Sequence, residues 1–362
     1  MFYFLSQFRE LHFGFNIFKY ITFRTGMAAF TTFLICVVFG PYFIRKLRMM
    51  KIGEIAKRDD CPDLDKFHGK KEGTPTMGGL FVIGSIVVSV LLWGNLTNPF
   101  VLLTLLTCVY LAVLGWVDDY RKLKKLGRNR GLTKRTKLIW EILLGCFIGS
   151  YVFFNPGTST QLDLPFLKDT IIDLGILYVP FVALIVIGTS NAVNLTDGLD
   201  GLAIGCVLVV SMTLAILSYI TGHLTISQYL FIPYVAEAAE LTVFCSAMVG
   251  ASLGFLWFNC HPATVFMGDT GSLSLGGTLG VMAVLIKKEL LLVIIGGVFV
   301  IEALSVILQV FSFRVLGKRI FKMAPFHHHL QMSGWEESKI IIRLWILGVI
   351  LALVALTTLK IR

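Results

Sequence analysis

Charge is scarce in this sequence. Only 15% of its 362 residues are Asp, Glu, Lys or Arg, whereas 56% are hydrophobic, and the mean hydropathy is +0.80. A chain of this length and composition has too little polar surface to cover a soluble globule. The composition therefore excludes a soluble globular protein and indicates a polytopic membrane protein.

A cysteine framework is also missing. Five of the seven cysteines fall in long apolar segments, and no CxxC pair is present, which argues against disulfides and cysteine metal sites. Cys260 next to His261 could bind zinc, but an ordinary loop is the simpler interpretation. Residues 1–20 lack an apolar core followed by a small-residue cleavage site, so we expect an interfacial helix there. Without internal repeats or low-complexity segments, we expect residues 1–362 to form a single domain.

Apolar runs of the length needed to cross a bilayer dominate the chain. A transmembrane helix needs roughly 20 apolar residues, and we expect ten such spans in an all-α membrane protein. They cover residues 21–44, 77–94, 98–117, 138–155, 174–190, 199–220, 240–258, 272–286, 290–313 and 341–359.

Positive charge is concentrated in three of the loops between these spans. Loops 45–76, 119–137 and 314–343 contain 24 of the 32 Lys and Arg residues. The positive-inside rule places these loops in the cytoplasm, and an even number of spans then puts both termini outside. The same alternation puts loops 191–198 and 259–271 in the cytoplasm.

Acidic residues lie where apolar segments meet these cytoplasmic loops. The adjacent pair Asp118 and Asp119 ends the third span, and hard carboxylate oxygens of this kind suit Mg²⁺. A solvated helix end is the alternative interpretation. The nine basic residues between 120 and 137 could anchor the topology, or they could bind a phosphate-rich substrate or an anionic lipid head group.

A second polar cluster has a regular spacing. Asn191, Asn194, Asp197 and Asp200 recur every third residue, so on a helix they would present neighbouring oxygen and amide groups. Such residues also cap helices, but capping requires one residue and not four. We therefore favour a functional site here.

The last two cytoplasmic loops add an aspartate and a histidine run. Asp269 lies between Gly268 and Gly271, which permit a tight turn that directs backbone N–H groups at an anion; simple helix capping explains the motif equally well. Residues 327–329 are three consecutive histidines. Histidines in a basic loop can bind diphosphate, transfer protons or bind a metal. Neighbours in an extended segment point to opposite faces, so we expect substrate contact and not one shared metal ion. Fortuitously exposed histidines are the alternative interpretation.

Five segments together resemble one enzyme family. They are KEGTPTMGG (71–79), DDY (118–120), NAVNLTDGLDGL (191–202), FMGDTGSL (266–273) and PFHHHL (325–330). In sequence and order they resemble the polyprenyl-phosphate N-acetylhexosamine 1-phosphate transferases, above all the branch that transfers phospho-N-acetylmuramoyl-pentapeptide. The resemblance extends from about residue 45 to the end of the chain.

The resemblance implies a reaction and its participants. UDP-N-acetylmuramoyl-pentapeptide and undecaprenyl phosphate would react with Mg²⁺ to give the lipid-linked diphosphate product, lipid I, and UMP. The enzyme would be a multi-pass protein of the bacterial inner membrane and a homodimer, with no nucleic-acid partner. Phosphoryl transfer of this kind asks the protein mainly to position two anions and to stabilise charge.

The resemblance also implies roles for individual residues. Asp269 matches the Mg²⁺ ligand, and Asp118 and Asp119 match an essential acidic pair that acts on the lipid phosphate. Asn194 and Asp197 match residues on the catalytic and nucleoside side, and we place Asn191 and Asp200 with them as substrate-binding residues. His328 is expected to be catalytic, with His327 and His329 as substrate contacts. Further positions that match the lining of the family's cleft are Lys71, Thr76, Lys122, Lys134 and Asn259. One departure is Gln331, where family members commonly have an acid.

Two other functions are compatible with part of the sequence. A sister transferase that moves N-acetylglucosamine 1-phosphate would keep the aspartate motifs, but the three histidines after Pro325 and the TPTMGG stretch favour the muramoyl branch. An ion-coupled transporter would use Glu302, which lies midway along the ninth span. A polar contact between helices, with Gln309 two turns away, is the simpler interpretation of Glu302. Most of the acids lie at helix ends and not near the midplane, which argues against a transporter.

Overall fold

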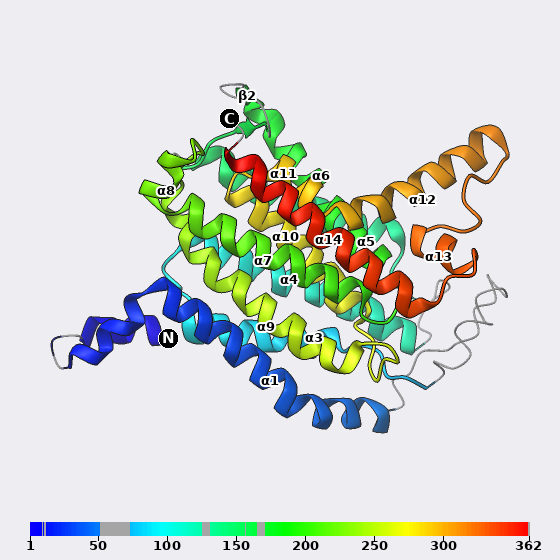
Figure 1. Ribbon diagram of the computed structural model, residues 1–362, viewed down its shortest axis with the longest axis horizontal. Helices are drawn as coiled ribbons and strands as arrows, with labels where there is room; N and C mark the ends of the chain where they lie inside the picture. The colour runs from blue at the N-terminus through cyan, green and yellow to red at the C-terminus, as the bar shows by residue number, and fades with distance from the viewer. Residues whose placement is uncertain are drawn as a thin grey trace.

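The computed structural model describes residues 1–8, 10, 12–50, 73–124, 131–155, 157–164 and 171–360. These residues form a bundle of long helices (Figure 1). The α-helices are α1 (Ile21–Met49), α3 (Gly79–Trp93), α4 (Pro99–Leu123), α5 (Lys134–Phe154), α6 (Tyr178–Thr196), α7 (Leu202–Thr221), α8 (Leu224–Tyr229), α9 (Leu241–Asn259), α10 (Gly268–Leu285), α11 (Glu289–Ile295), α12 (Gly297–Leu316), α13 (Phe326–Gln331) and α14 (Glu337–Thr357). The expected all-α membrane architecture is confirmed.

Eight of the helical segments are long and apolar enough to cross a bilayer. The other two expected spans are also helices: α3 has 15 residues and α10 has 18. The ninth expected span, 290–313, is wrong as a single helix, because the chain divides at Gly296 into α11 and α12. Ten membrane crossings, and the side on which each terminus lies, remain predictions.

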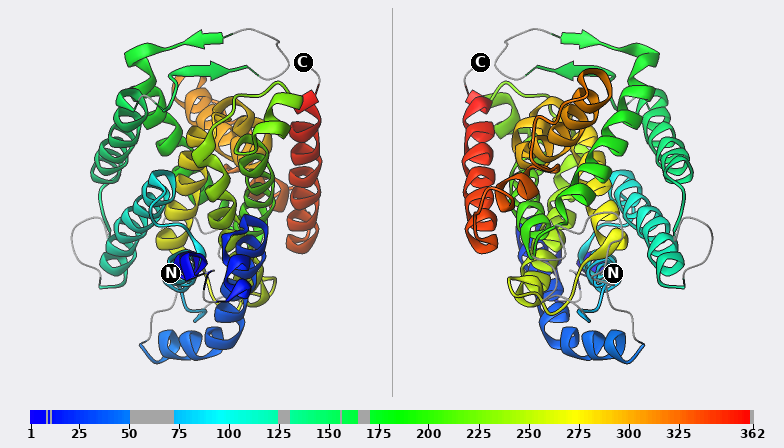
Figure 2. Two further views of the ribbon diagram at one scale, coloured as in Figure 1. Left: turned by 90° about the vertical axis from the view of Figure 1, so that its left-hand side faces the viewer. Right: turned by 90° about the vertical axis from the view of Figure 1, so that its right-hand side faces the viewer.

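A small β-hairpin was not expected from the sequence. Strands β1 (Gln161–Asp163) and β2 (Ile171–Asp173) pair antiparallel and lie across one end of the bundle (Figure 2). Both termini are at this end, and α13 and the end of α1 are at the other (Figure 1). The expected interfacial helix is instead two short 3₁₀ segments, Phe2–Phe8 and Phe13–Lys19. Phe2 packs against Trp93 of α3, with ring centroids 4.6 Å apart.

Helix α10 is the centre of the bundle. All of its residues from Thr270 to Leu285 are buried, and it packs against α3, α4, α6 and α7. Small residues allow this close approach, as is common where helices pack in membranes. At Gly115 of α4, a Cβ atom would lie only 2.6 Å from the Cα of Thr270 and would overlap the carbonyl of Asp269.

The absence of a side chain at Gly115 sets the distance between α4 and the start of α10. We expect Gly115→Ala to destabilise the protein by about 1–3 kcal/mol, the usual cost of overpacking. Thermal unfolding in detergent measures this change. Gly84→Ala in α3 is the matched control, because a Cβ atom there meets nothing within 4 Å and alanine is intrinsically better than glycine in a helix. Equal stability of the two variants would contradict the packing argument.

Candidate functional site

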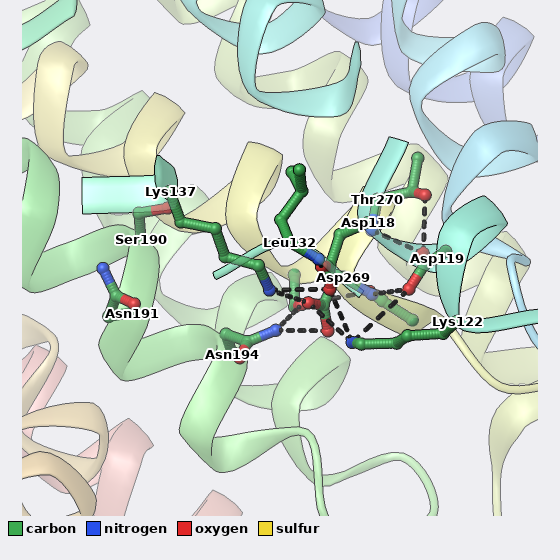
Figure 3. Close-up of polar contacts among 12 residues, drawn as sticks. Asp118, Asp119, Lys122, Leu132, Lys137, Ser190, Asn191, Asn194, Asp269 and Thr270 are labelled. Atoms are coloured by element: carbon green, nitrogen blue, oxygen red, sulfur yellow. Dashed lines mark hydrogen bonds and ion pairs between the residues drawn. The ribbon is translucent and has the colours of Figure 1, made fainter. Parts of the chain in front are cut away.

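Three helix ends meet at one polar cluster. Asp118 and Asp119 lie in the last turns of α4, Asp269 lies in the first turn of α10, and Asn194 lies near the end of α6. One carboxylate oxygen from each of the three aspartates lies within 4.8 Å of the other two. Figure 3 shows Asp118 and Asp269 close together between the helices, with Asp119 to one side, next to Thr270. The sequence separates Asp118 from Asp269 by 151 residues, so only the fold brings them together.

Two lysines lie between the aspartates. The Nζ atom of Lys122 is 2.7 Å from Oδ2 of Asp118 and 3.0 Å from Oδ2 of Asp269. Lys137 of α5 reaches the same two oxygens from the other side, at 2.7 and 2.5 Å (Figure 3). Because three carboxylates at this spacing repel one another, the two ammonium groups stabilise the arrangement.

Asp119 differs from the other two aspartates in its partners. Its Oδ1 accepts a hydrogen bond from the backbone N–H of Asp269 at 3.2 Å, and its Oδ2 accepts from the backbone N–H and the hydroxyl of Thr270 at 3.0 and 2.7 Å. A carboxylate that binds the free N–H groups of a first helical turn acts as an N-cap. Asp119 therefore caps α10 from α4, which fixes the position of Asp269.

Asp118 and Asp269 have fewer backbone contacts. Asp118 accepts one, from the N–H of Leu132 at 2.6 Å. Oδ1 of Asp269 accepts from the side-chain amide of Asn194 at 3.0 Å, and the same amide donates to the hydroxyl of Ser272 at 2.8 Å. The oxygens of these two aspartates that meet the lysines therefore face the centre of the cluster.

The donor set of this cluster fits a hard divalent cation. Carboxylate oxygens are the protein ligands that Mg²⁺ prefers, usually one or two together with phosphate and water. Asp269 and Asp118 supply such oxygens, whereas those of Asp119 are occupied by α10. Asp269 is therefore more than a helix cap. Its backbone N–H is capped by Asp119, and its own carboxylate contacts Asn194 and the two lysines.

The expectation that Asn191, Asn194, Asp197 and Asp200 share one helix face is wrong. Helix α6 ends at Thr196, so the chain turns before Asp197 and Asp200. The amide of Asn191 donates to buried Glu141 at 2.8 Å, which the sequence analysis missed. Asp200 meets Nδ1 of His261 at 3.1 Å and also accepts from the N–H of Ala263 at 3.0 Å. Asn194 reaches the aspartate cluster, because its amide donates to Asp269.

A second group with metal-like spacing surrounds Asp200. Asp200, His261 and Glu337 place one ligand atom each within 4.8 Å of the others. Asn259 supports this region, because its side chain accepts from the N–H of Gly201 at 3.0 Å and donates to the carbonyl of Val265 at 2.8 Å. Cys260 is exposed and is not part of this group.

The remaining expected cleft residues have different positions. Thr76 lies beside Gly268, close to Asp119. Lys134 is exposed at the first residue of α5, and Lys137, one turn later, is the lysine that contacts the aspartates. Lys137 belongs to the basic run from 120 to 137, but nothing in the sequence distinguished it from the other basic residues as the one that contacts the aspartates. Lys71 lies outside the described residues.

The histidine run is not extended, contrary to our expectation, because Phe326–Gln331 form helix α13. Each imidazole has its own partner. Nδ1 of His327 meets Glu302 at 3.0 Å, Nδ1 of His328 meets Gln331 at 2.7 Å, and Nδ1 of His329 accepts from the N–H of Lys322 at 3.1 Å. Among the described residues, no three-residue metal-like group includes these histidines. Their roles toward substrate remain predictions.

Comparison with known proteins identifies the family. The model of glycosyl transferase family 4 matches residues 101–287, a range that contains Asp118 and Asp269. The phospho-N-acetylmuramoyl-pentapeptide-transferase of Geobacter sp. (strain M21) is 55% identical over 348 residues, and that of Desulforapulum autotrophicum is 51% identical over 350, each covering 96% of both chains. The corresponding protein of Brachyspira hyodysenteriae is 49% identical over 379 residues, covering 98% of both. With that identity along nearly its whole length, the chain belongs to the phospho-N-acetylmuramoyl-pentapeptide transferases.

Proposed function

We propose that the protein transfers phospho-N-acetylmuramoyl-pentapeptide from its UDP-linked precursor to undecaprenyl phosphate, giving lipid I and UMP. The observation that carries this proposal is the cluster of Asp118, Asp119 and Asp269 with two lysines, where α4, α5, α6 and α10 meet. It combines cation-binding carboxylates with lysine donors for phosphate, which are the parts that phosphoryl transfer needs. On the family resemblance we further propose Mg²⁺ as the cation, a bacterial inner-membrane location, a homodimer, and one catalytic domain that comprises residues 1–362.

The reaction forms one P–O bond and breaks another. An oxygen of undecaprenyl phosphate attacks the phosphorus that carries the sugar, and the bond from that phosphorus to the oxygen of UMP breaks. Lys122 and Lys137 lie where they can bind the negative oxygens of the two substrates. A bound Mg²⁺ ion, held by Asp269 and Asp118, would supply charge stabilisation for the transferring group.

The three aspartates receive different roles in this proposal. Asp118 faces the lysines and is the better candidate to accept a proton from the lipid phosphate, because both oxygens of Asp119 are bound by the start of α10. Asp119 then acts by holding Asp269 in place. Asn194 orients Asp269 through its amide. Asn191, Asp197, Asp200, Asn259, Thr76, Lys71 and the histidines remain proposed substrate contacts.

The direct test is product formation. Purified protein, the UDP-linked muramoyl precursor, undecaprenyl phosphate and Mg²⁺ are incubated together, and UMP and the lipid product are measured by chromatography. We expect both products in equal amounts, and neither when undecaprenyl phosphate or the divalent cation is omitted. Folded protein that releases no UMP would contradict the proposal, and so would activity that persists in excess chelator.

Asp269→Asn tests the charge at the centre of the cluster. The amide keeps the shape of the side chain but loses the charge that would hold a divalent cation and pair with the lysines. We expect the loss in kcat to exceed tenfold, which corresponds to more than about 1.4 kcal/mol in the barrier, with an unchanged thermal midpoint. Glu336→Gln is the control, because that acid is exposed, with a side-chain exposure of 77%. A tenth or more of the activity remaining in Asp269→Asn would count against cation binding there.

Lys137→Met and Lys134→Met separate the observed lysine from the one expected by resemblance. Both remove a positive charge from the first turn of α5, but only Lys137 touches Asp118 and Asp269. Loss of a charge-assisted contact in the transition state typically reduces kcat by about 10²-fold or more. We therefore expect that reduction for Lys137→Met and a much smaller one for Lys134→Met in the UMP assay. The reverse order would show that the lysines are placed incorrectly.

A further inference from the structure

Apart from Arg314 in its last turn, helix α12 has one polar stripe on an otherwise apolar surface. Glu302, Ser305, Gln309 and Ser312 follow one another at intervals of three or four residues, so they share one face. Large apolar side chains elsewhere on the helix, such as Ile307 and Phe311, are exposed, as expected where a helix faces lipid. A polar stripe in such a helix requires partners inside the protein.

Gln309 and Ser312 have their partners in the chain that follows the helix. The hydroxyl of Ser312 donates to the carbonyl of Lys318 at 2.9 Å. Oε1 of Gln309 accepts from the N–H groups of Ile320 and Phe321 at 3.1 and 2.9 Å, and its amide donates to the carbonyl of Phe321 at 3.1 Å. The segment after α12 is therefore fastened back along the helix that precedes it. Gln309 binds this segment and not Glu302.

Glu302 makes the innermost of these attachments. Its Oε2 accepts from the backbone N–H of His327 at 3.3 Å and lies 3.0 Å from Nδ1 of the same residue. Both side chains are fully buried, with 0% exposure. One carboxylate oxygen thus holds both the backbone and the ring of the first residue of the histidine run.

The other edge of the His327 ring faces the turn that follows α6. A Cβ atom at Gly198 would lie 3.0 Å from Cε1 of His327 and would overlap its Nε2. Glycine at 198 therefore lets the imidazole lie directly against the backbone of this turn. Asn194, four residues earlier, binds Asp269. His327 consequently joins α12 to the turn beside the aspartate cluster.

His327 also sets the position of its neighbour. The rings of His327 and His328 have centroids 4.2 Å apart, and α13 is only six residues long. A helix this short has little stability of its own, so contacts at its start decide where it lies. The contact with Glu302 is made at that start.

We propose that Glu302 is a positioning residue for phosphoryl transfer. By accepting two hydrogen bonds from His327, it fixes α13 against the turn at Gly198 and so places His328 for contact with substrate. This inference rests on the proposed function. Glu302 does not touch the substrate, and its contribution is made through His327 alone.

A double-mutant cycle tests this route, because residues that act through one another are non-additive. The variants are Glu302→Ala, His327→Ala and the double variant, assayed for UMP release. Misplacement of a catalytic group by about 1 Å costs ~10²-fold, so we expect each single variant to lose about that much in kcat. The double variant should match His327→Ala to within about threefold. Losses that multiply, to about 10⁴-fold, would overturn the proposal.

Glu302→Gln keeps an acceptor at the same place and removes the charge. If Glu302 acts by accepting hydrogen bonds, this variant should keep kcat within about tenfold of the wild type, and it remains informative if Glu302→Ala does not fold. A Gln variant as inactive as the Ala variant would show that the negative charge is required, against the proposal. Ser305→Ala is the matched control, because this buried residue lies one turn further and, among the described residues, its hydroxyl bonds only to the backbone carbonyl of Glu302. Wild-type protein that releases no UMP would refute the function itself, whereas active wild type with additive variants would refute only the role of Glu302.

Discussion

Repulsion between three carboxylates, two of them buried and the third partly buried, is the constraint around which this end of the bundle is built. At a separation of about 4 Å, two like charges repel by about 4 kcal/mol when the effective dielectric constant is near 20. Lys122 and Lys137 offset that repulsion by lying between Asp118 and Asp269. The packing of the helices keeps these two aspartates and two lysines together. A shift of α4, α5 or α10 would separate at least one charge from its partner.

Asp118 and Asp119 show how two adjacent acids can make different contacts. Two adjacent aspartates at a helix end look equivalent in the sequence, but consecutive residues on a helix point about 100° apart. One of them therefore reaches the first turn of α10, and the other reaches the lysines. Gly115, one turn earlier, allows the backbones to approach closely enough for this contact.

The sequence was sufficient to locate most of the long helices and the polar ends at which the cluster forms. Long apolar runs determine spans, and acids at their ends determine which edge is polar. It was insufficient wherever the position of a helix end mattered. Because α6 stops at Thr196, Asp200 lies beyond the helix and meets His261. Asn191 lies within α6, but its amide binds Glu141 of α5 and not the aspartate cluster.

Tertiary contacts account for the other differences. Whether Lys134 or Lys137 contacts the aspartates depends on the rotation of α5 about its axis relative to α4. The run of basic residues does not determine that rotation. The pairing of Glu302 with His327 joins residues 25 positions apart through a reversal of the chain, and the polar stripe of α12 becomes interpretable only when that reversal is known. The break between α11 and α12 at Gly296 likewise could not be predicted, because residues 290–313 are apolar on both sides of it.

The net charge of the cluster bears on how it would bind its substrates. Asp118, Asp119 and Asp269 with Lys122 and Lys137 sum to −1, which would repel a diphosphate and a lipid phosphate. A divalent cation held by Asp118 and Asp269 would change that sum to +1. Each lysine carries an ammonium group with three N–H donors on a flexible stem. The ammonium groups can therefore turn from the carboxylates to the phosphate oxygens when substrate binds. The two lysines that neutralise the carboxylates would then also stabilise the negative charge of the transferring phosphoryl group.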